Sequence, residues 1–253
     1  MAELRAARVV YQVHAPATGG IGATELAQVI ARHPVATGHI DVQSHAGADA
    51  PRFARASLPA ASDFMPALDF DAYARLRQAQ VIWRVEVSEV APEDLGYLRS
   101  ALLIAGELAA MSGGIVVDML AFVKLGAQDI VRELDRAFDP QRQVAIHVER
   151  GQRPFFIHTH GMEKFGHPDF ELHGVPRASV EVARRLLRHL IAAVVSGGRF
   201  CEGESTQLCG FSFLFGRSEC GEIGHFTAGS LSLRNFRLVA GLATPEMEGM
   251  LIA

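Results

Sequence analysis

Histidines and carboxylates are concentrated in one short part of the chain. Four of the eleven histidines fall within sixteen residues, and three acidic residues lie among them: His158, His160, His167, His173, Glu163, Asp169 and Glu171. The segment Phe155 to His160 is typical of a strand, so His158 and His160 are expected to point to one face. Two neighbouring imidazoles with a carboxylate form a ligand set for a divalent metal ion. The sequence therefore predicts that any ligand site of this protein includes the segment from His158 to His173.

The composition of this segment allows two functional interpretations. In the first, the protein is a non-catalytic binding or interaction protein without a cofactor, which holds a small molecule or a protein partner through His158, His160, Glu163, His167, Asp169 and Glu171. In the second, a divalent metal bound by His158, His160 and Asp169, or by Glu171 in place of Asp169, serves a hydrolase-like, metal-dependent enzyme. The first is favoured because no complete catalytic motif is present: there is no Gly-x-Ser-x-Gly elbow, and the glycines near residue 20 lack the dinucleotide fingerprint.

The same segment resembles the signature of a known family. Residues 159–171 read Thr-His-Gly-Met-Glu-Lys-Phe-Gly-His-Pro-Asp-Phe-Glu. They are similar to Thr-x-Gly-(Met/Leu)-x-x-Phe-Gly-x-Pro-(Asp/Glu)-x-Glu, the signature of an uncharacterised bacterial domain family of unknown function. The resemblance implies a bacterial, cytoplasmic protein with a long helix and a further strand after the signature, and it implies no activity or cofactor. In physical terms, Gly161 and Gly166 allow tight turns that gather the carboxylates around one loop.

Composition limits the classes of partner. The chain has 253 residues and a formal net charge of -4, and its Lys and Arg residues form no basic cluster, so a nucleic-acid partner is not expected. No apolar stretch approaches the length of a membrane span, and no secretory signal is visible at the start, which excludes a membrane partner and predicts a cytoplasmic location. The three cysteines, Cys201, Cys209 and Cys220, form no Cys-x-x-Cys pair and are expected to be free thiols.

Hydrophobic periodicity predicts an α+β fold in which antiparallel sheets are covered by long amphipathic helices. Alternating patterns predict strands over 8–14, 81–88, 144–148, 155–160 and 230–238, the first with one buried face. Helical periodicity predicts long helices near 92–111 and 179–195, and shorter ones from Thr24 to Pro34 and over 129–138. Residues 44–72 show little periodicity and several prolines, which is typical of a long surface connection.

The chain divides by its pattern into an N-terminal α+β half, 1–140, and a C-terminal α+β half, 141–253, which form either two domains or one compact domain. In both halves a strand leads to a helix that ends at Ser-Gly-Gly. A duplication that produced two related halves would explain this likeness, and so would chance, because Ser-Gly-Gly is a common helix stop.

Overall fold

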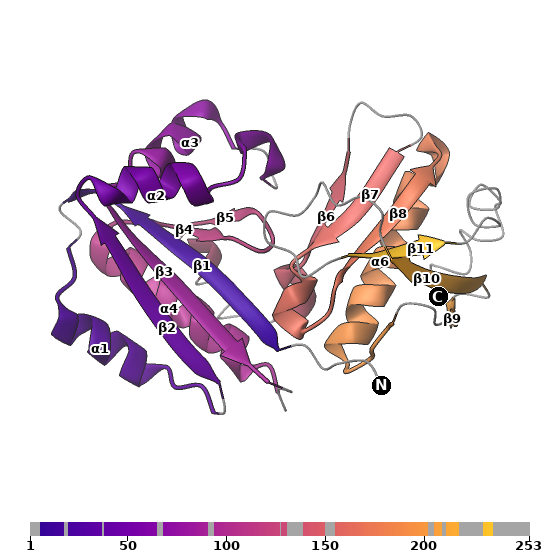
Figure 1. The fold of residues 1–253 in the computed structure, drawn as a ribbon, viewed down its shortest axis with the longest axis horizontal. Coiled ribbons are helices and arrows are strands. Elements are labelled where there is room, and N and C mark those ends of the chain that lie inside the picture. Colours follow the sequence, from indigo (N-terminus) through magenta and orange to yellow (C-terminus); the bar gives the residue numbers. More distant parts are fainter. Residues whose placement is uncertain are drawn as a thin grey trace. The chain divides into compact units, whose positions relative to one another are not determined.

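The computed structural model describes residues 6–17, 20–36, 38–64, 68–90, 94–126, 128–130, 139–149 and 155–201, and the backbone of 205–208, 211–217 and 230–234. These residues fall into two compact units that meet in the sequence at Pro140 and Gln141. Figure 1 shows the elements of both units.

The first unit is built on a five-stranded antiparallel sheet with strand order β2-β3-β1-β4-β5. Its strands are β1 (Ala7–Ala15), β2 (His39–Ala46), β3 (Val81–Glu89), β4 (Ile115–Asp118) and β5 (Val123–Leu125). The central strand β1 pairs with β3 along its whole length and with β4 over its second half. Nearly every residue of β1 is buried, so it has two buried faces and not the single one that its alternation predicted.

Helices cover both faces of this sheet, which explains the burial of β1. The long helix α4 (Gly96–Ser112) packs on β1 and β3, and α1 (Ala23–Arg32) packs against α4. On the other face, α2 (Asp49–Ser57) and α3 (Phe70–Arg77) pack on one another. Leu76 of α3 lies in a buried cluster with Val10 and Phe64, and Ala50 and Ala54 of α2 lie in a second cluster with Ile82. The only tryptophan, Trp83 of β3, is buried as its strand pattern predicted.

The prediction of a long surface connection over residues 44–72 is wrong. The end of β2, all of α2, a short 3-10 turn (Ala61–Asp63) and the start of α3 occupy it. The strand β2 is an edge strand with polar residues along it, so its alternation is weak. Pro51 lies in the first turn of α2, where a missing backbone N–H costs no helical hydrogen bond.

The second unit contains a six-stranded sheet with strand order β6-β7-β8-β11-β10-β9. Its strands are β6 (Ala145–Val148), β7 (Phe155–His160), β8 (Asp169–Val175), β9 (Ser205–Leu208), β10 (Phe211–Arg217) and β11 (Ser230–Arg234). All described pairs are antiparallel except β8 with β11, so this sheet is mixed. Three short 3-10 turns, Pro140–Gln143, Met162–Phe165 and Arg177–Ser179, connect its first elements.

The helix α6 (Val180–Val195) packs on β7 and β8 and buries the apolar stripe that its sequence predicted, including Leu186, Leu187 and Leu190. The α+β class and the two long covering helices are therefore confirmed. The helices α4 and α6 end in the same type of cap. Gly114 N donates to Ala109 O at the end of α4, and Gly198 N donates to Ala193 O at the end of α6. The two sheets nevertheless differ in strand order.

Some predictions fall on residues outside the described part of the chain. These are most of the helix over 129–138, the strand end after Arg234, and Cys209 and Cys220. Cys201 is described and half-buried. Within the described part of the chain, no helix has the length and apolar character needed to cross a membrane.

Candidate metal centre

The hairpin of β6 and β7 brings a third histidine to the His-x-His pair. In its antiparallel register His147 lies opposite His158, and Ala145 lies opposite His160. Side chains that face one another across two strands share a face of the sheet, as do residues two apart on one strand. His147, His158 and His160 therefore gather on one face of the hairpin.

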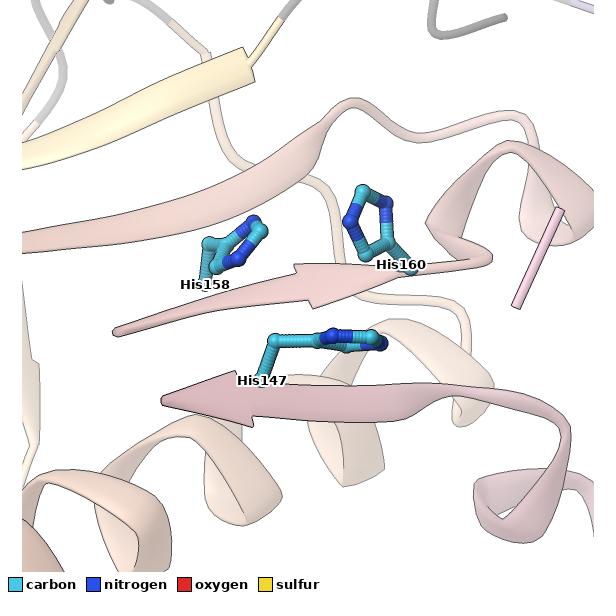
Figure 2. Close-up of side chains that lie close together, drawn as sticks. All are labelled: His147, His158 and His160. Carbon is cyan, nitrogen blue, oxygen red and sulfur yellow. The ribbon is translucent and has the colours of Figure 1, made fainter. Parts of the chain in front are cut away.

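Each of the three imidazoles offers a nitrogen, and these three atoms lie within 4.8 Å of one another (Figure 2). The ring centroids are 4.7 Å apart for His158 and His160, 4.7 Å for His147 and His160, and 5.4 Å for His147 and His158. All three side chains are buried. Ligand atoms on one tetrahedral zinc ion lie about 3.3–3.6 Å apart, so small side-chain rotations would complete a three-nitrogen site.

Burial keeps the imidazoles of His158 and His160 neutral at neutral pH. Burial, followed by the charge of His147, lowers the pKa of His158 from its ordinary 6.5 to about 3. Burial, followed by the charges of His158 and His147, also lowers the pKa of His160 well below 6.5. A neutral imidazole is the form that binds a metal ion, because protonation uses the lone pair that the metal needs.

Two carboxylates lie beside the cluster. Glu171 of β8 is opposite His158 in the sheet and is almost completely buried, and its Oε2 accepts a hydrogen bond from Nε2 of the half-exposed His173 at 3.0 Å. Glu149, just beyond β6, places its Oε1 3.3 Å from His158 Nε2 and is 52 % exposed. Phe156 stacks on the His158 ring at 4.7 Å and lies tilted against His173 at 4.5 Å, so it covers one side of the cluster.

Asp169, which the sequence places among the metal ligands, is engaged in hydrogen bonds within the loop between β7 and β8. Its Oδ1 accepts hydrogen bonds from the Thr159 hydroxyl at 2.9 Å and from Met162 N at 3.2 Å, while Thr159 Oγ1 accepts from Phe170 N at 2.8 Å. Burial, the largest effect, raises the pKa of Asp169 to about 7, and the charge of Glu163 adds to this. The third member of the histidine cluster is therefore His147 and not Asp169.

The loop between β7 and β8 is shaped by the residues of the signature. Gly161 and Gly166 have φ angles of 108° and 64°, which confirms their predicted role in turns. Lys164 is completely buried, and its Nζ donates to Gln143 O at 2.7 Å. This bond ties the loop to the chain just before β6, and so helps to hold β6 beside β7.

His167 does not join the cluster, although it lies in the predicted segment. Its Nε2 accepts from Phe200 N at 3.2 Å, so its Nδ1 carries the hydrogen and donates to Pro168 O at 2.7 Å. The ring packs against Phe170 and Phe200. The hydrogen bond at Nε2 thus fixes the loop to the chain after α6, while the bond at Nδ1 lies within the loop.

Sequence reasoning found His158 and His160 but missed His147, which lies on the preceding strand. The predicted hairpin was the signal that could have pointed to His147, because His147 is one of few polar residues in it. Its partner could not be assigned because the length of the turn, and hence the register, was unknown.

No family model, curated protein or solved structure matches the chain. The resemblance of residues 159–171 to a family signature stays a prediction.

Proposed function

We propose that this protein binds a divalent transition-metal ion, with zinc as the reference metal, through His147, His158 and His160, and that it is a metal-dependent enzyme of the hydrolase type. The observation that carries this proposal is the convergence of three buried imidazoles from two paired strands. Burying three polar rings in mutual contact costs free energy, which a shared metal ion would offset.

The chemistry follows from the ligand set. Imidazole nitrogen suits zinc, copper, iron and nickel, and catalytic zinc sites commonly have three protein ligands and a position left for water. A zinc ion in such a site lowers the pKa of its bound water toward neutrality and so supplies hydroxide for hydrolysis. A metal-free binding module is the competing interpretation, and it gives no account of why three histidines meet.

The test is metal uptake by the purified 253-residue chain. After chelation and dialysis, the wild type should take up one equivalent of zinc or cobalt, measured by elemental analysis and by titration. His147→Gln and His158→Gln should each lose this uptake with unchanged circular dichroism. His39→Gln is the matched control, because His39 is exposed on β2 of the other unit and should leave uptake unchanged.

A wild type that takes up no metal, or a His147→Gln variant with wild-type affinity, would refute the metal site. The hydrolytic part is tested separately, with an activated ester as the probe. The zinc-loaded wild type should cleave it faster than both the metal-free protein and His147→Gln in equal zinc, and equal rates would refute this part.

A further inference from the structure

The short contact between Glu149 and His158 is not a hydrogen bond. His158 Nε2 and Glu149 Oε1 are 3.3 Å apart, yet His158 Nε2 has no hydrogen-bond partner among the described residues.

The distance does fit two atoms that share a metal ion. A nitrogen and an oxygen that are each about 2.0–2.2 Å from one tetrahedral zinc lie about 3.3–3.6 Å apart. The observed 3.3 Å between Glu149 Oε1 and His158 Nε2 falls at the lower end of this range. The carboxylate is therefore already placed as a neighbouring ligand of the nitrogen that is buried without a partner.

We propose that Glu149 is the fourth ligand of the three-histidine site, and that it is a displaceable ligand for which water or a small anion can substitute. This inference rests on the proposed metal site. Glu149 is 52 % exposed, whereas the side chain of His158 is 3 % exposed, so solvent reaches the site on the side of Glu149. A carboxylate with this much freedom can leave the metal without disturbing the buried imidazoles.

Glu171 is the other carboxylate within reach, and it suits this role less well. It is 1 % exposed, and its Oε2 is engaged by His173 at 3.0 Å. A buried carboxylate that is held by a hydrogen bond cannot exchange readily with solvent. Glu171 lies opposite His158 in the sheet, so it would be a fixed neighbour of the site and not an exchangeable ligand.

The experiment uses cobalt as a spectroscopic substitute for zinc and azide as the small anion. The visible absorption of cobalt reports the number and type of its ligands, so the wild-type spectrum should indicate four coordination with no exchangeable water. Glu149→Ala should still bind cobalt, with about tenfold to hundredfold lower affinity and a changed spectrum. Azide should bind to the cobalt form of Glu149→Ala at least about tenfold more tightly than to wild type, because it no longer competes with the carboxylate.

Two further variants complete the test. Glu181→Ala removes an exposed glutamate on α6 that pairs with Arg184, and it should match wild type in cobalt spectrum and azide affinity. Glu171→Gln should keep the wild-type azide affinity. Failure of the wild type to bind cobalt refutes the metal site itself. Cobalt binding with identical spectra and azide affinities in wild type and Glu149→Ala, or a changed azide affinity only in Glu171→Gln, overturns the assignment of Glu149 alone.

Discussion

Acid should destabilise the first unit through His14, and the effect can be calculated from its surroundings. His14 is 3 % exposed, and its Nδ1 donates to Leu76 O at 2.8 Å. Burial lowers the pKa of His14 from 6.5 to about 4, although the hydrogen bond to Leu76 opposes this. Between pH 6.5 and about pH 4 the folded state therefore binds fewer protons than the unfolded chain. The unfolding free energy falls as the pH falls through 6.5.

The magnitude follows from the unfolded state, in which the histidine titrates normally. At pH 5, protonation of His14 in the unfolded chain, with its ordinary pKa of 6.5, stabilises the unfolded state by about 2 kcal/mol. In the folded protein His14 stays neutral at this pH. Between pH 8 and pH 5, the unfolding free energy of the wild type should thus fall by about 2 kcal/mol more than that of His14→Gln. The glutamine keeps a donor for Leu76 O but does not titrate.

Trp83 provides the assay. It is the single tryptophan, it is buried in β3, and its register partner Val13 is adjacent to His14. Urea titrations followed by its fluorescence therefore report the unfolding of the unit that contains His14. The unfolding free energy of His39→Gln, at an exposed site on β2, should fall as much as that of wild type between pH 8 and pH 5. An equal fall in wild type and His14→Gln would refute the assignment of the proton to His14.

Three other predictions concern the second unit and the thiols. Leu187 is fully buried in α6, so Leu187→Ala should lower the unfolding free energy by about 2–5 kcal/mol in urea titrations followed by circular dichroism, and an unchanged midpoint would contradict the packing. Zinc at one hundred times its dissociation constant should stabilise the folded second unit by about 2.7 kcal/mol in the same assay, whereas His147→Gln should gain nothing; an equal gain would place the metal elsewhere. Thiol titration of freshly purified, denatured protein without reductant should find all three cysteines free, and a single reactive thiol would reveal a disulfide.

The elements with strong periodicity were predictable, and the reason is their burial. In α6 the apolar residues recur at helical spacing because one stripe packs on β7 and β8. In β3 the buried and half-exposed residues alternate, as its sequence indicated. The segment around β2 and α2 gave no such signal, since β2 is an edge strand with polar side chains and α2 buries only two alanines.

The candidate site was predictable only in part, because strand register is not a local property. The spacing of His158 and His160 alone places them on one face of a strand. Joining them to His147 requires the pairing of residues eleven apart, which depends on the turn between β6 and β7. The role of Asp169 was missed for a related reason: its partner Thr159 lies on another strand, and their contact closes the loop between them.

The position of β6 has a consequence for chemical handling of the protein. It is an edge strand of four residues, and β7 is its only described neighbour. A metal ion held by His147 together with His158 and His160 would pin this edge in place. Chelation would remove this metal link between β6 and β7. A loosened β6 would offer unpaired backbone groups to the edge strand of a second molecule. Storage in chelating buffers should therefore promote self-association, visible as a shift toward larger species in size-exclusion chromatography that added zinc prevents.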